Sequence, residues 1–174
     1  NSLFNVPPGV YTDVVPISIY SVRANGTLDY ETTRYLTLSI SIPRYAELSI
    51  VPQNSPHDPS STFYVMDFGV LSSNAEMMAD LRIKSNVPFG LSMSSVNGGK
   101  LEKTMGTTAV PYQIKVGSNN YATPHTWSTW ILQTFWGTSQ SGNSYTLRVK
   151  LGNVPATLDD GDYQDIVTFT VQAY

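Results

Sequence analysis

The sequence predicts an all-β fold arranged as an antiparallel sandwich, and three observations support this. First, about eight short segments alternate apolar and polar side chains with a period of two, as half-buried strands do. Second, turn residues separate these segments about every 8–15 positions, which is typical of sandwiches. Third, no long segment has helical periodicity, and strands do not alternate with helices as they do in an α/β enzyme.

Composition narrows the class of protein. Only 13% of the 174 residues are charged, about half the usual share, and hydroxyl, amide and tyrosine side chains supply the polarity, as in extracellular β-proteins. The net charge of −3 and ten scattered basic residues exclude a surface that follows nucleic-acid phosphates. Without cysteine there is no disulfide and no thiolate zinc site. No apolar run approaches the length of a membrane span. No signal peptide is visible, as expected of a mature or trimmed chain.

The predicted strands follow from the alternation. The cleanest is residues 36–42, in which every even position is aliphatic and every odd position is hydroxylated, before Pro43 interrupts it. The last strand, residues 167–173, has apolar side chains at its odd positions and follows a turn at residues 159–161. Since the sequence stops on this strand, we expect an open edge beside it. The other predicted strands cover residues 46–50, 63–71, 80–85, 89–94, 111–116 and 145–150.

The last strand has a near copy at the other end of the chain. Residues 9–19 and 161–171 share the frame Gly-x-Tyr-x-Asp-x-Val-x-(Ile/Phe)-x-(Ile/Val), and their first glycines are 152 residues apart. A repeat at this distance indicates duplicated domains. We therefore predict that residues 1–21 are the final strand of a preceding domain or a donated strand, that residues 22–35 are a linker, and that residues 36–174 are the domain itself. The apolar residues of the first segment need a partner outside that domain, which we expect to be a separate chain: Val10, Val15, Ile17 and Ile19.

Four motifs carry a family resemblance. They are Met66-Asp67-Phe68-Gly69-Val70-Leu71, Ser85-Asn86-Val87-Pro88-Phe89-Gly90-Leu91, Val110-Pro111-Tyr112-Gln113-Ile114 and the C-terminal Gly-x-Tyr-x-Asp-x-Val strand. In this order they resemble the spore coat protein U family, the subunits of archaic chaperone–usher pili. The resemblance covers roughly residues 36–174. The chain departs from the family in having no cysteine, since these pilins often carry a disulfide.

The resemblance implies an immunoglobulin-like sandwich that lacks its last strand, with a groove between its first and final strands. A donor strand or a chaperone would occupy this groove, as in chaperone–pilin donor-strand complementation. Burial of four or five donor side chains would contribute roughly 6–15 kcal/mol of gross apolar stabilisation. One wall is expected from Leu36, Leu38, Ile40 and Ile42. The other wall is expected from Tyr163, Val167, Phe169, Val171, Ala173 and Tyr174.

The implied partners are a periplasmic pilus chaperone, an outer-membrane usher and neighbouring pilus subunits, with a surface or glycan receptor for an adhesin. The implied location is an extracellular pilus on a bacterial surface, reached through the periplasm. The N-terminal repeat makes the chain resemble the pilin domain of a two-domain tip adhesin. Another arrangement within this class is a shaft subunit that donates residues 10–22, which Pro16 disfavours because it removes a ladder donor.

Catalytic chemistry is not indicated, so we predict no enzyme, no cofactor and no metal. The sequence has no Gly-x-Ser-x-Gly, phosphate loop or His-Glu-x-x-His motif. The pair His57-Asp58 is expected to lie in a solvated loop, and residues 159–162 are a turn without the spacing of a calcium loop. Asp165 and its repeat counterpart Asp13 are expected to fix turns by hydrogen bonding.

An aromatic cluster supports an alternative function. Trp127, Trp130 and Trp136 lie within ten residues, and such a cluster suits either a sandwich core or a sugar-binding platform. The core interpretation is favoured because Ile131 and Leu132 lie inside the run. The alternative function is a stand-alone extracellular carbohydrate-binding sandwich. Stability separates the two, since a self-sufficient module folds alone and a donor-dependent pilin does not.

Overall fold

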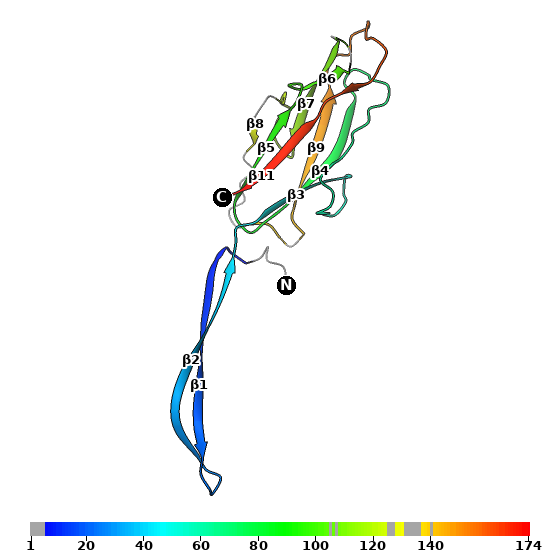
Figure 1. Cartoon of the computed structure of the whole chain (residues 1–174). Coiled ribbons are helices and arrows are strands. Elements are labelled where there is room, and N and C mark those ends of the chain that lie inside the picture. The colour runs from blue at the N-terminus through cyan, green and yellow to red at the C-terminus, as the bar shows by residue number, and fades with distance from the viewer. Residues whose placement is uncertain (1–5, 105, 107, 125–127, 131–136, 140) are drawn as a thin grey trace.

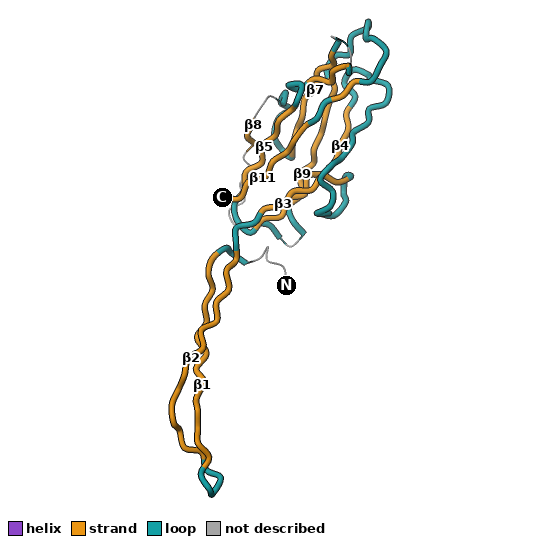
Figure 2. The backbone as a smooth tube through the Cα atoms, viewed as in Figure 1, coloured by secondary structure: helices purple, strands orange, loops and turns teal. Residues whose placement is uncertain are grey.

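The computed structural model describes residues 6–104, 106, 108–124, 128–130, 137–139 and 141–174. Figure 2 shows strands and loops, and no helix among the described residues is long and apolar enough to cross a membrane. The strands are β1 Gly9–Val22, β2 Leu28–Ile42, β3 Ala46–Val51, β4 Glu76–Ser85, β5 Phe89–Ser95, β6 Lys100–Lys103, β7 Ala109–Val116, β8 Ser128–Trp130, β9 Asn143–Leu151, β10 Tyr163–Gln164 and β11 Val167–Ala173.

Strands β3 to β11 form an antiparallel sandwich. One sheet has the order β10-β6-β7-β9-β4-β3, and the other has the order β11-β5-β8. The prediction of an all-β, immunoglobulin-like sandwich is confirmed. Strands β1 and β2 form a separate two-stranded sheet, which extends away from one end of the sandwich (Figure 1).

The core lies between the two sheets and follows the period-two pattern. On β5, Phe89, Leu91 and Met93 are buried and alternate with partly exposed Ser92 and Ser94. They meet fully buried side chains of the opposite sheet, among them Leu81, Ile83 and Ile114. β11 adds half-buried Val167, Phe169 and Val171 to this cluster, while Thr168 and Thr170 are exposed. The predicted faces of the last strand are therefore confirmed.

Residues 63–71 differ from the prediction, because they form no strand. Their apolar pattern is used: Tyr64, Met66, Phe68 and Leu71 pack against the core. However, none of the described strands lies beside this segment to supply backbone partners. The segment has one partly buried face and no ladder.

The β1–β2 hairpin replaces the expected linker at residues 22–35, since residues 28–42 form one continuous strand. The register runs from Gly9 opposite Ile42 to Val22 opposite Leu28, with a bulge between Ile19 and Tyr20. The Asn25-Gly26 turn closes it, with Gly26 at φ +82° and the Arg23 amide donating to the Thr27 carbonyl at 2.8 Å. β1 is extended and sheet-paired outside the sandwich, as expected, but its partner is β2 of the same chain rather than a separate chain.

Candidate functional site

An open groove of about 600 Å³ runs along the sandwich. One wall is the unpaired segment, residues 62–69 with Leu71, and the other is the chain leading into β11, residues 161–167 with Phe169. The floor comes from side chains of the six-stranded sheet: Ile50, Leu101, Tyr112, Ile114, Leu147 and Val149.

Both walls carry backbone groups without partners. β11 pairs with β5 along its length, from Val167 opposite Ser95 to Ala173 opposite Phe89, and is an edge strand on its other side. Across the groove, residues 63–68 make no backbone hydrogen bond to any segment that the structure describes. Two extended segments thus face each other across an apolar floor, each with an unpaired row of donors and acceptors.

Asp165 fixes the start of the β11 wall. Its carboxylate accepts hydrogen bonds from the Tyr112 and Ser95 hydroxyls, from the Asn97 amide at 3.0 Å and from the Ile166 amide at 2.7 Å. Burial raises the pKa of Tyr112, and the hydrogen bond to Asp165 raises it further. The interpretation of Asp165 as a residue that fixes a turn is confirmed.

Tyr163 fixes the chain just before that turn. Its hydroxyl donates to the Asp159 carbonyl, four residues upstream, at 2.9 Å, and lies 2.7 Å from the Thr108 hydroxyl. This is the tyrosine corner of immunoglobulin-like sandwiches. The backbone of Tyr163 and Gln164 pairs with β6 of the large sheet, so the chain changes sheets at Asp165 to become β11.

The predicted position of the other wall is wrong. Leu36, Leu38 and Ile40 lie on β2, away from the groove, where they are 48%, 51% and 58% exposed, and Ile42 is buried at the hairpin base. A period-two pattern identifies an apolar face but not the sheet it joins, and β1 is the neighbour within reach of a short turn. Residues 62–71 take the expected place.

Only some of the residues predicted for the β11 wall line the groove. Tyr163, Val167 and Phe169 line the groove, whereas Val171 packs against the core beyond it. Ala173 pairs with Phe89 at the far end. Tyr174 lies over Gly90, where a Cβ atom would come within 2.7 Å of the tyrosine hydroxyl. These last two residues are therefore not groove residues.

Sequence reasoning missed Tyr64, Met66 and Phe68 as groove residues. Their signal was present, because the segment alternates like a strand and contains the Asp67-Phe68-Gly69 motif. Of the tryptophans, Trp127 and Trp136 lie outside the described residues. Trp130 lies in β8, and its backbone pairs with that of Leu91 in β5. The four apolar residues predicted to need a partner lie on β1 and are exposed: Val10, Val15, Ile17 and Ile19.

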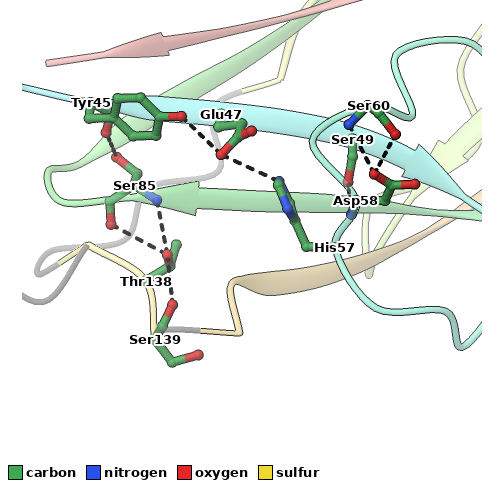
Figure 3. Close-up of polar contacts among 9 residues, drawn as sticks. All are labelled: Tyr45, Glu47, Ser49, His57, Asp58, Ser60, Ser85, Thr138 and Ser139. Carbon is green, nitrogen blue, oxygen red and sulfur yellow. Dashed lines mark hydrogen bonds and ion pairs between the residues drawn. The ribbon is translucent and has the colours of Figure 1, made fainter. Parts of the chain in front are cut away.

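His57 lies in the loop that leads into the unpaired wall, and its ring is directed towards Glu47 (Figure 3). The expectation of a solvated loop is wrong for this residue, whose side chain is only 2% exposed, with Nε2 3.9 Å from Glu47 Oε2. Neither ring nitrogen has a hydrogen-bond partner. Burial lowers the pKa of His57, as does nearby Lys84, while Glu47 and Asp58 act in the opposite direction. Within the described residues, no three His, Asp or Glu side chains converge to hold a metal ion.

Asn86 joins the hairpin to the sandwich. Its side-chain amide donates to the Pro43 carbonyl at 2.9 Å, and its side-chain oxygen accepts from the Tyr45 amide at 2.8 Å. The neighbouring Ser85 hydroxyl donates to the Tyr45 carbonyl at 2.9 Å (Figure 3). The Ser85-Asn86 motif noted in the sequence therefore has a structural role at this junction.

No protein-family model matches the chain, and no curated protein matches it. Among solved structures, it is similar to a chain in the crystal structure of the CsuC–CsuE chaperone–tip adhesion subunit pre-assembly complex from archaic chaperone-usher Csu pili of Acinetobacter baumannii. The TM-score is 0.50 at 18% sequence identity, and the likeness covers 96% of this chain and 60% of that chain. At this identity the likeness concerns the fold, an immunoglobulin-like sandwich related to those of pilus proteins.

Proposed function

We propose that the chain is a structural subunit of a chaperone–usher pilus, assembled when an extended strand from another protein enters the groove beside β11. The observation that carries this proposal is the pair of unpartnered walls over an apolar floor. A strand placed between them completes both rows of backbone hydrogen bonds and buries its alternate side chains on the floor, which is the physical basis of strand donation.

The same geometry explains why such a subunit needs a carrier. An empty groove exposes Val167, Phe169, Met66 and their neighbours beside an unpaired edge, a combination that favours aggregation. A periplasmic chaperone that fills the groove, an usher and the neighbouring subunits are therefore the proposed partners. The proposed destination is an extracellular pilus. The similar fold of a chain from a chaperone–adhesin complex supports this assignment.

The hairpin supports a position at the pilus tip. Its apolar residues are exposed, and a second domain that covers them, as in a two-domain tip adhesin, would bury them. In this proposal residues 1–42 form part of a preceding domain, residues 43–174 form the pilin domain, and the preceding domain contacts a surface or glycan receptor.

The test is production of the chain in the periplasm alone and together with a periplasmic pilus chaperone. We expect aggregation or rapid proteolysis alone, and a soluble one-to-one complex with the chaperone. Protection of the odd-numbered β11 amides from hydrogen exchange, which face the open edge, should appear only in the complex. A monomer that unfolds cooperatively without help and gains nothing from the chaperone would overturn the proposal.

A further inference from the structure

The repeat in the sequence is also a repeat of local structure. Gly9 and Gly161 have φ values of +155° and +146°, a conformation that favours glycine. The Tyr11 hydroxyl donates to the Pro7 carbonyl at 2.7 Å, four residues upstream, as Tyr163 does to Asp159 at 2.9 Å.

The aspartates of the repeat agree as well. Asp13 Oδ1 accepts from the next amide, that of Val14, at 2.9 Å, and Asp165 Oδ1 accepts from the Ile166 amide at 2.7 Å. β1 thus begins with the same glycine, tyrosine corner and aspartate as the chain that enters β11. In its local geometry β1 therefore corresponds to β11, the strand that follows the tyrosine corner of an immunoglobulin-like sandwich.

β2 lies on the edge of β1 that corresponds to the open edge of β11. In an extended strand, backbone groups of alternate residues point to the same edge. The Arg23 amide bonds to Thr27 across the turn, so the odd-numbered residues of β1 face β2, and Pro16, which has no N–H, faces away. In β11 the Ile166 carbonyl and the Tyr174 amide bond to the β5 side, so its odd-numbered residues face the open edge. The even spacing of the repeat preserves this parity.

We propose that β2 is a copy, within this chain, of the kind of strand that the groove lacks. This rests on the proposed function and specifies the ligand: a segment antiparallel to β11, with aliphatic side chains spaced as in Leu36, Leu38 and Ile40. On the hairpin these lie opposite Val15, Asp13 and Tyr11. Their counterparts in the groove are the positions opposite Val167, Asp165 and Tyr163.

The side-chain directions fit this register. Directly opposed residues of an antiparallel pair project from the same face. On the hairpin, Leu36 and Ile40 therefore share a face with Val15 and Tyr11. The counterparts of Val15 and Tyr11 are Val167 and Tyr163, both of which line the groove. A strand in this register directs its aliphatic side chains to the floor, at Leu101, Tyr112 and Ile114.

The test is an extension of the full chain by a second copy of residues 23–42, placed directly after Tyr174, which corresponds to Val22 in the repeat. The added segment should form the same Asn-Gly turn and return along β11. We expect the extended chain to be recovered without a chaperone as a soluble monomer with a cooperative unfolding transition, which the unextended chain lacks. We also expect hydrogen exchange to slow at least 100-fold at the odd-numbered amides, Val167, Phe169 and Val171. The even-numbered amides, already bonded to β5, should change little.

Two control extensions make the outcomes distinct. In the first, the added copies of Leu36, Leu38 and Ile40 are serine, and in the second the added strand alternates Val and Thr without the β2 sequence. Protection by the β2 extension and not by its serine version supports the inference. Equal protection by the serine version, or protection by the Val–Thr strand alone, overturns the inference and leaves the proposed function standing. If no extension protects the odd-numbered amides, the groove does not accept a strand, and both fail.

Discussion

β1 and β11 have the same sequence frame and the same local geometry but opposite environments. β1 is paired along one edge with β2, and none of the described strands forms a second sheet beneath it, so Val15, Ile17 and Ile19 are exposed. β11 has the sandwich core beneath Val167, Phe169 and Val171, but its corresponding edge is open. Local sequence therefore sets the corner and the strand, whereas burial and edge pairing depend on partners that the strand does not encode.

The comparison also separates two requirements for a stable strand. A two-stranded ribbon is at most marginally stable in water, and its apolar face needs a cover. The hairpin has an edge partner but no cover, and the sandwich has a cover but no edge partner at β11. Equivalent substitutions in the two regions should therefore change the stability of the sandwich by different amounts.

The largest difference is expected for a charge on the apolar face. Phe169→Asp places a carboxylate against the core and should cost about 3 kcal/mol or more, enough to abolish recovery of a chaperone complex. The equivalent Ile17→Asp on the exposed hairpin, and Thr170→Asp on the exposed face of β11, should leave the yield near that of the parent. Yields of the co-expressed complexes give the comparison. Similar losses at Phe169 and Thr170 would contradict the face assignment.

The next largest difference in stability is expected between substitutions of Asp165 and Asp13. Asp165→Asn removes a charge that accepts hydrogen bonds from Tyr112, Ser95 and two amides, and should destabilise the sandwich by about 2 kcal/mol. Asp13→Asn affects one exposed local hydrogen bond and should change sandwich stability by less than about 0.5 kcal/mol. The measurement is denaturant unfolding, without chaperone, of the chain that carries the added copy of residues 23–42 after Tyr174. Equal effects would mean that Asp165 contributes only locally.

The tyrosine corners offer a milder version of the same test. Tyr163→Phe loses the bonds to Asp159 and Thr108 and should cost about 1 kcal/mol. Tyr11→Phe should leave sandwich unfolding unchanged, because its bond lies within the N-terminal segment. If a second domain covers the hairpin, Tyr11→Phe should destabilise that domain by about as much as Tyr163→Phe destabilises the sandwich. This pair of variants therefore also tests the proposed second domain.

These comparisons indicate how much of the molecule the sequence predicts. Strands such as β5 and β11 were predictable because their alternation is a property of one segment. The failure at residues 63–71, and the wrong position of residues 36–42, have one cause: a ladder is a property of two segments, and periodicity does not name the second one. The burial of His57 was missed because a loop rich in Pro, Asp and Ser reads as solvated. The repeat predicted that Asp165 fixes a turn by hydrogen bonding, but it did not predict which residues donate to its carboxylate.

The smallest expected effect is a pH dependence confined to the sandwich. Burial lowers the pKa of His57 in the folded state, so unfolded chains bind its proton more readily. The stability from neutral His57 is therefore present above its unfolded pKa, about 6.5, and is lost as pH falls through its lower folded pKa. Exchange of the Ile50 amide, which bonds to Ser61 at 3.0 Å, should accelerate at acidic pH, while the hairpin turn amides should not respond. His57→Phe should remove this response. If the variant keeps it, another group is responsible.

The pairing of β11 with β5 also sets the order in which this domain is completed. A chain emerging from the ribosome or an export channel presents Phe89, Leu91 and Met93 long before the strand that pairs with them, since Val167 lies opposite Ser95. Contacts so distant in sequence pay a large loop-closure entropy before they return any stabilisation, and they form late. One edge of β5 therefore stays unpaired for most of the time the domain takes to appear. The sandwich is most vulnerable before its final strand arrives, and only with that strand in place does the groove have both of its walls.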